Sequence, residues 1–172
     1  SATKNIPRGQ RPNLYDHSLR VPTAIRWPGT IKPNTILPHT ISTVDWFPTL
    51  TAIAGGKLPK NTILRGRNFL PILQGKKVDW DNDFFAEYST KHQSRTHMRG
   101  WRTPKWKLIR DFLNQQRDEL YDLAGDPDET NNLIHSKDPR HLAIIKELHA
   151  KILARMQETK APVLKLAESR KN

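Results

Sequence analysis

Five side chains that could bind an anion lie close together in one short stretch. They are His92, Arg95, His97, Arg99 and Arg102. A guanidinium group offers a planar fork of N–H donors to the oxygens of a sulfate, phosphate or carboxylate, and imidazole nitrogens hydrogen-bond sugar hydroxyls or their anionic groups. The stretch is therefore a candidate ligand site. The alternative is that each is an ordinary solvated residue, which is the commoner role of a charged side chain.

A second candidate is Arg11, which lies in the turn-rich stretch 9–13. The stretch 14–19 after it is short and mixed, with Tyr15 and His17. We predict a short buried strand over 20–27, which Pro28-Gly29 closes with a turn. A loop that ends at a buried strand is a good place to hold a functional side chain rigidly. On residue type alone, an exposed loop arginine remains the commoner interpretation of Arg11.

The strands that would position the histidines and arginines follow from the pattern after residue 82. Strands are predicted over 84–88, 96–103, 106–112 and 118–123, and their short connections favour an antiparallel sheet. Alternate residues of a strand face opposite sides, so His97, Arg99 and Trp101 should share one face. Thr96, Met98 and Gly100 should share the other. The five candidate side chains therefore cannot all reach one pocket.

Helical signals flank this sheet on both sides. Asp138-Pro139 begins a long helix that we expect to end near residue 160, with Asp138 as its cap and a basic tail that frays beyond it. Its apolar stripe is Leu142, Ile145, Leu148, Ile152 and Met156. A shorter helix is predicted over 42–54, capped by Thr43 or Asp45, with Phe47, Leu50, Ile53 and Ala54 forming its apolar face. Asp45 is interpreted as a cap, because an Asp at a helix start is more often a cap than a catalyst.

Composition limits the classes of function. The net charge of +12 favours a polyanionic partner such as nucleic acid, an anionic membrane or a sulfated polysaccharide, although a solvated basic surface explains it equally well. No zinc-finger or RNA-recognition pattern is present, so nucleic acid is not an expected partner. The sequence has no cysteine, no apolar run long enough to span a membrane, and no signal peptide at its start.

Several short motifs resemble, in order and spacing, the C-terminal region of sulfatases of the alkaline-phosphatase-like superfamily. They are Leu14-Tyr15-Asp16, Leu19-Arg20-Val21-Pro22, Trp27-Pro28-Gly29, Asp45-Trp46-Phe47-Pro48-Thr49-Leu50, the turn 66–75, the strand pair Met98-Arg99 to Arg110, and Glu119-Leu120-Tyr121-Asp122-Leu123 followed by Asp126-Pro127-Asp128-Glu129. Most sulfatases have a lysine where Arg11 stands. Arginine there, followed by Asn13-Leu14-Tyr15, is similar to the N-sulfoglucosamine sulfohydrolase (heparan N-sulfatase) branch.

The resemblance implies an α/β fold: the C-terminal portion of an alkaline-phosphatase-like sulfatase, with a small antiparallel sheet packed on a long C-terminal helix. Residues 1–80 would finish the large α/β domain, and 81–172 would form a C-terminal subdomain. Arg11 would neutralise charge on the sulfate in the transition state, and His92, Arg95, His97 and Arg99 would contact the substrate. The substrate would be a sulfated sugar or glycan, either a sulfate ester or an N-sulfate.

The resemblance also implies a formylglycine nucleophile and calcium for the full-length enzyme, and neither the Cys/Ser-x-Pro-x-Arg motif nor the acidic metal motifs occur here. We therefore expect no cofactor in this chain, no activity from it alone, and a partner in the N-terminal sulfatase domain. The full-length enzyme would be periplasmic, secreted or lysosomal in type. The alternative hypotheses are a stand-alone basic module that binds sulfated polysaccharide or another polyanion, and a scaffold that associates through an unpaired sheet edge.

Overall fold

The structure, a computed structural model, describes residues 13–61, 63–91 and 95–168. It divides into two compact units. The first contains 13–21 and 83–168, and the second contains 22–82. Each unit is described by itself. The prediction that residues 1–80 complete a large α/β domain is not tested by this division.

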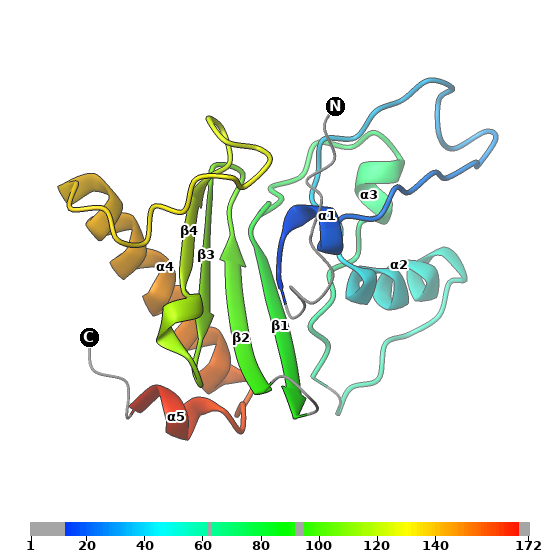
Figure 1. Cartoon of the computed structure of the whole chain (residues 1–172). Coiled ribbons are helices and arrows are strands. Elements are labelled where there is room, and N and C mark those ends of the chain that lie inside the picture. Colours follow the sequence, from blue (N-terminus) through cyan, green and yellow to red (C-terminus); the bar gives the residue numbers. More distant parts are fainter. Residues whose placement is uncertain (1–12, 62, 92–94, 169–172) are drawn as a thin grey trace. The chain divides into compact units, whose positions relative to one another are not determined.

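The first unit is built on a four-stranded antiparallel sheet in the order β1-β2-β3-β4 (Figure 1). The strands are β1 (Phe84–Lys91), β2 (Arg95–Arg102), β3 (Trp106–Asp111) and β4 (Glu119–Asp122), with the short 3-10 helix η2 (Gln115–Arg117) before β4. Each strand pairs with the next along the chain, and Gly100 faces Ala86 on one side and Ile109 on the other. The antiparallel sheet predicted from the sequence is confirmed.

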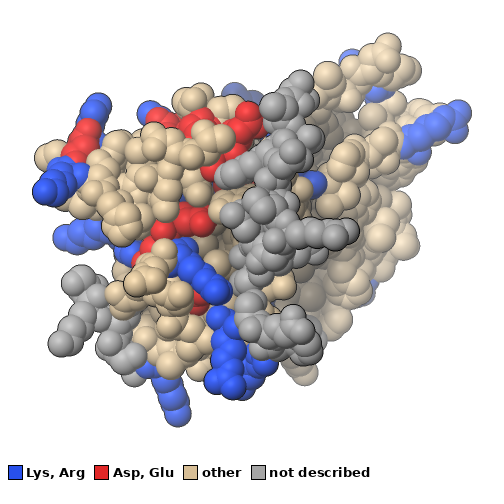
Figure 2. All heavy atoms as spheres, in the orientation of Figure 1, with Lys and Arg blue, Asp and Glu red and all other residues tan. Residues whose placement is uncertain are grey.

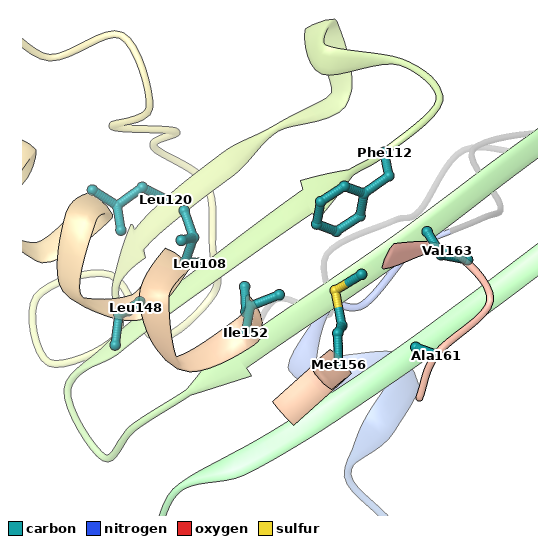
Figure 3. Close-up of a cluster of buried hydrophobic side chains, with 8 residues drawn as sticks. All are labelled: Leu108, Phe112, Leu120, Leu148, Ile152, Met156, Ala161 and Val163. Atoms are coloured by element: carbon teal, nitrogen blue, oxygen red, sulfur yellow. The ribbon is translucent and has the colours of Figure 1, made fainter. Parts of the chain in front are cut away.

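Helix α4 (Pro139–Glu158) lies along one face of this sheet (Figure 1). The Asp138 side chain accepts a hydrogen bond from the Arg140 N–H at 2.8 Å, which confirms it as the N-cap. Three residues of the predicted stripe, Leu148, Ile152 and Met156, are buried and pack with Leu108 and Leu120 of the sheet (Figure 3). Leu142 is 51% exposed, so the apolar stripe is one turn longer than the core that it covers.

The chain after α4 is packed rather than frayed as far as it is described. Ala161 and Val163 are buried beside Met156 and Phe112 in the same core (Figure 3). The short helix α5 (Leu164–Glu168) follows. The prediction of a frayed tail after residue 160 is therefore wrong for 161–168, because this part of the tail is mostly apolar and packs against the core.

The outer edge of β4 is occupied by the chain itself. Asn132 accepts a hydrogen bond from the Leu120 N–H at 3.0 Å and donates one to the Asp118 carbonyl at 3.1 Å. The Leu133 N–H then donates to the Leu120 carbonyl at 2.8 Å. Backbone groups that would otherwise point outward from this strand are thus satisfied by one amide side chain and one neighbouring residue.

The second unit contains the 3-10 helix η1 (Thr43–Asp45), helix α2 (Trp46–Ile53) and helix α3 (Leu70–Leu73). Its centre is Asp45, whose carboxylate accepts from the Ser42 N–H and from the Arg67 N–H, both at 2.7 Å. The Asp45 side chain therefore caps η1 rather than α2. A Cβ at Gly66 would lie 1.9 Å from the Val44 carbonyl oxygen, so this close approach requires glycine.

Two sequence predictions in the stretch 13–61 need correction. Residues 20–27 form no strand, and Val21 is 74% exposed; the apolar residues there are too few and too interrupted by Pro22 to build one. Residues 16–19 instead form the short helix α1 (Asp16–Leu19). The apolar face of α2 is also exposed, with Phe47 at 53% and Leu50 at 54%, and the buried residues of this helix are Pro48 and Thr49.

No helix within the described ranges is both long and apolar enough to cross a membrane.

The packing of α4 predicts a sharp difference between two of its stripe residues. Ile152→Ala should lower the free energy of unfolding by about 2–5 kcal/mol, because Ile152 is fully buried between the helix and the sheet. Leu142→Ala, on the same helix, should change it by about 0.5 kcal/mol or less. Urea denaturation followed by circular dichroism measures both, and equal losses would contradict this account of the core.

Candidate functional site

The residues that follow Arg11 are held to the sheet by a buried group of charges, which we call the anchor cluster: Asp16, Arg102, Lys107 and Glu129. The Lys107 ammonium donates to Asp16 Oδ1 at 2.5 Å, Glu129 Oε1 at 2.7 Å and the Leu14 carbonyl oxygen at 3.1 Å. Lys107 and Glu129 are each only 1% exposed. The three N–H donors of the ammonium thus meet three acceptors, which is what allows a charge to be buried there.

Asp16 is the point where this cluster meets the chain after Arg11. Arg102 binds its carboxylate with two nitrogens, Nε at 3.1 Å and Nη2 at 2.9 Å, and Glu129 Oε2 accepts from the Asp16 N–H at 2.6 Å. Burial by itself would raise the pKa of the Asp16 carboxyl, but the hydrogen bonds of Arg102 and the charge of Lys107 hold that pKa below its ordinary value. The carboxylate therefore stays ionised inside the protein.

The neighbours of Asp16 pack against the sheet as well. Leu14 is buried, and a Cβ at Gly100 would lie 3.1 Å from Leu14 Cδ1, so the side chain fits where β2 carries no side chain of its own. The Tyr15 hydroxyl donates to Glu119 Oε1 at 3.0 Å. Burial, together with the Glu119 charge, raises the pKa of Tyr15 to about 12. The Leu-Tyr-Asp tripeptide therefore contacts the sheet through all three of its residues.

A second polar group lies on β1 and β2. His97 Nδ1 and Ser89 Oγ are 2.9 Å apart, and Arg99 Nη1 donates to the same Ser89 oxygen at 3.1 Å. Arg99 also donates to the Met98 carbonyl at 2.7 Å and lies 3.0 Å from Glu87 Oε1 through Nε. The guanidinium is almost wholly buried, so much of its hydrogen-bonding capacity is used within the sheet.

Electrostatics favour a neutral imidazole in this group. Burial, followed by the positive charges of Arg99 and Lys91, lowers the pKa of His97 below its ordinary value. Burial also lowers the pKa of the Arg99 guanidinium, and the Glu87 carboxylate opposes that shift. A neutral imidazole has one donor nitrogen and one acceptor nitrogen, which suits it to hydroxyl groups as well as to anions.

The structure places the sequence-predicted site residues on different faces. His97 and Arg99 share a face with Trp101, on the side that α4 covers, as the alternation predicted. Leu14 packs with Met98 and Ala86 on the opposite face. The described residues therefore do not bring His97 and Arg99 onto the face against which residues 14–16 pack.

The remaining candidates lie at or beyond the limits of the described residues. Arg95 is exposed at the start of β2, opposite Lys91. Arg11 and His92 lie outside the described residues, and their roles stay predictions. Among the residues that the structure describes, no group of three or more His, Asp and Glu side chains could hold a metal ion.

Sequence reasoning did not single out the anchor cluster, although two signals for it were present. Lys107 is a lysine between Trp106 and Leu108 in a strand that is otherwise buried, and such a lysine needs a carboxylate partner. Glu129 belongs to the polar turn after β4, which is one of the motifs of the family resemblance. What the sequence could not show is that the two meet at Asp16, because the three residues are far apart along the chain.

The sequence that forms this arrangement matches a known protein family. A family model described as the C-terminal region of N-sulphoglucosamine sulphohydrolase matches residues 10–158. The chain belongs to this sulfatase family. The match includes the segment of the anchor cluster, the sheet and helix α4, and it confirms the resemblance seen in the sequence motifs.

Individual sulfatases show the same relationship. The chain is 26% identical to rat steryl-sulfatase over 86% of its own length and 30% of the relative, and 30% identical to an ulvan-active sulfatase of Formosa agariphila over 78% and 33%. A solved structure in complex with its substrate D-glucosamine-2-N,6-O-disulfate matches 80% of this chain and 28% of its own, at 25% identity and a TM-score of 0.62. This sulfatase chain thus spans about a third of the length of such relatives, and its alkaline-phosphatase-like α/β fold is confirmed.

The anchor cluster predicts how stability depends on pH. Because the pKa of Asp16 is lower in the folded protein than its ordinary 3.8, its ionised form stabilises the fold above pH 3.8, and this contribution is lost as the pH falls through the folded-state pKa. Asp16→Asn should lower the free energy of unfolding by about 3 kcal/mol near neutral pH. The difference in the free energy of unfolding between the variant and the unchanged protein should become smaller below pH 3.8.

Urea denaturation at a series of pH values measures this difference. Asp79→Asn, at an exposed position of the second unit, is the matched control and should follow the unchanged protein at every pH. A loss of stability in Asp16→Asn that stays constant down to strongly acidic pH would contradict the proposal that ionised Asp16 stabilises the fold.

Proposed function

We propose that this chain is the C-terminal part of an enzyme that hydrolyses sulfate esters or N-sulfates of a sulfated sugar or glycan. The observation that carries the proposal is the family match over residues 10–158. The structural relative solved with a disulfated glucosamine supports a sugar substrate, since its amino sugar carries both an N-sulfate and an O-sulfate. The chain contributes contacts to the substrate and to the sulfate.

Arg11 is the sulfate contact in this proposal. Negative charge accumulates on the sulfate oxygens as the S–O or S–N bond breaks, and a fixed guanidinium stabilises that charge more in the transition state than in the ground state. Support comes from the segment that follows it, because residues 14–16 are attached to the sheet by the anchor cluster. His92 and Arg95 are proposed as further contacts to the sugar or its sulfate groups. His97 and Arg99 are not included, because they lie on the face of the sheet opposite to residues 14–16.

The cofactors that the family implies do not fit the residues of this chain. The sequence has no Cys/Ser-x-Pro-x-Arg motif in which a formylglycine could be made, and the described part of the chain holds no cluster of potential metal ligands. We propose that the nucleophile and the calcium ligands are supplied by the rest of the enzyme. The chain's own role is to bind and orient the substrate, so the 172 residues alone should be inactive.

The partner that supplies those groups is proposed to dock on helix α2. Val44, Phe47, Leu50 and Ile53 form an exposed apolar surface on and next to this helix, which we call the α2 surface. Exposed apolar patches of this kind mark interfaces. The occupant is taken to be the remainder of the sulfatase, because the chain spans only about a third of the length of its relatives.

The family match, rather than the charge, favours this function over a polyanion-binding module. On the face shown in Figure 2, basic and acidic side chains are interspersed. Several of the least exposed cations are paired with carboxylates, as Lys107 is with Glu129, Arg110 with Asp118 and Arg99 with Glu87. The net charge of +12 is the excess that remains after every acidic residue is counted, so charge by itself does not distinguish a sulfated glycan from another polyanion.

The role of Arg11 is tested in the whole sulfatase that contains this chain. Arg11→Ala should lower kcat by about 10²–10³-fold, because one fixed donor to the developing charge is lost. Arg11→Lys should retain much of the activity, since it keeps the positive charge. Arg26→Ala, an exposed arginine of the second unit, is the control and should leave kcat unchanged. Unaltered hydrolysis by Arg11→Ala would refute the proposed contact.

The α2 surface predicts that one substitution has different effects in two contexts. In the 172-residue chain, Phe47→Asp should change the free energy of unfolding by about 0.5 kcal/mol or less, since the ring is already 53% exposed. In the whole sulfatase it should destabilise by about 2 kcal/mol or more, because a charge would be buried in an apolar interface. Leu142→Asp on α4 is the control for an added charge. A Phe47→Asp effect that is equally small in both proteins would argue against docking there.

A further inference from the structure

Apart from the Lys107–Glu129 pair, the contacts of the anchor cluster described above are made to Leu14 and Asp16. Lys107 binds the Leu14 carbonyl and the Asp16 side chain, Glu129 binds the Asp16 N–H, and Arg102 binds the Asp16 carboxylate. A backbone carbonyl and a backbone N–H two residues apart are both fixed. The cluster therefore sets the direction of the main chain as well as its position.

Glu129 has a special place among these contacts because it uses both carboxylate oxygens. Oε1 accepts from the Lys107 ammonium at 2.7 Å, and Oε2 accepts from the Asp16 N–H at 2.6 Å. Glu129 thus orients Lys107 and also binds the main chain at Asp16 directly. Glu129 lies in the turn after β4, Lys107 near the start of β3, and neither is close to Asp16 along the chain.

Stability alone is a weak reason for such a cluster. Replacing buried ion pairs by well-packed apolar side chains is often neutral or stabilising. A hydrogen bond, in contrast, requires a particular orientation of its donor and acceptor, whereas an apolar contact does not. The Leu14 side chain already supplies an apolar contact on the same face. The additional charges are thus better explained by a need for a precise geometry at 14–16.

We propose that Lys107 and Glu129 are positioning residues for the sulfatase reaction, acting through the main chain of 14–16 on Arg11. This inference rests on the proposed function of Arg11. Residue 11 precedes Leu14 by three residues, so at most about 11 Å of chain separates it from the point that the cluster fixes. A misplacement of about 1 Å at a catalytic group lowers the rate by about 10²-fold, which makes this restraint functionally important.

The test is a double-mutant cycle in the whole sulfatase, with kcat and KM for a sulfated sugar and the free energy of unfolding measured for each protein. Glu129→Gln keeps the shape of the side chain but replaces one acceptor by an NH₂ donor, so it disturbs either the Lys107 or the Asp16 contact. We expect it to lower kcat by about tenfold or more with Arg11 present, and by less than about twofold in the Arg11→Ala background. Its effect on stability should be the same in both backgrounds.

Ile152→Ala is the matched control, because it destabilises the same unit through the opposite face of the sheet; in it, kcat should be unchanged at a temperature where the protein is folded. If Glu129→Gln does not fold, Lys107→Arg replaces it, since the larger guanidinium keeps the charge but not the three-acceptor geometry. Loss of kcat by Glu129→Gln that is equal with and without Arg11 would overturn the inference. An Arg11→Ala enzyme with full activity would instead overturn the proposed function.

Discussion

The buried ammonium group of Lys107 is the contact on which the geometry of the sheet unit depends. It is almost inaccessible to water, and it joins three parts of the chain: β3, the turn that holds Glu129, and the segment 14–16. Its burial is favourable only because two carboxylates and one carbonyl surround it. The position of each of the three parts therefore depends on the positions of the other two. Leu14 and the apolar residues on this face of the sheet pack around the same point.

The second unit uses the same principle with the opposite charge. There the buried group is the Asp45 carboxylate, which is bound by the N–H groups of Ser42 and Arg67, while the Asp45 carbonyl accepts from the Thr49 hydroxyl. Thr49 Oγ1 in turn accepts from the Phe69 N–H at 3.0 Å. In both units a short irregular segment is fixed by a charged residue that binds backbone groups, where regular secondary structure is too short to do so.

The sequence predicted the regular parts of the fold well, for physical reasons that are visible in particular residues. Asp138-Pro139 marks a helix start by local chemistry alone, and the alternation around His97 and Arg99 assigns faces without any tertiary information. The strand prediction at 20–27 was wrong because a short apolar run interrupted by Pro22 does not by itself form a strand. The anchor cluster was missed because its members are brought together only by the tertiary structure. The predicted site residues followed from family motifs, and their positions relative to a substrate depend on parts of the enzyme beyond the described residues.

The Asn132 amide has a consequence for how this sheet can associate with other molecules. An exposed strand edge is a template on which a foreign strand can pair. At β4 the outward hydrogen-bonding groups of Leu120 and the carbonyl of Asp118 are already satisfied by Asn132 and Leu133. A foreign strand could pair with Leu120 only by displacing Asn132 and Leu133, so the Asn132 amide, which resembles a peptide group, protects this part of the edge.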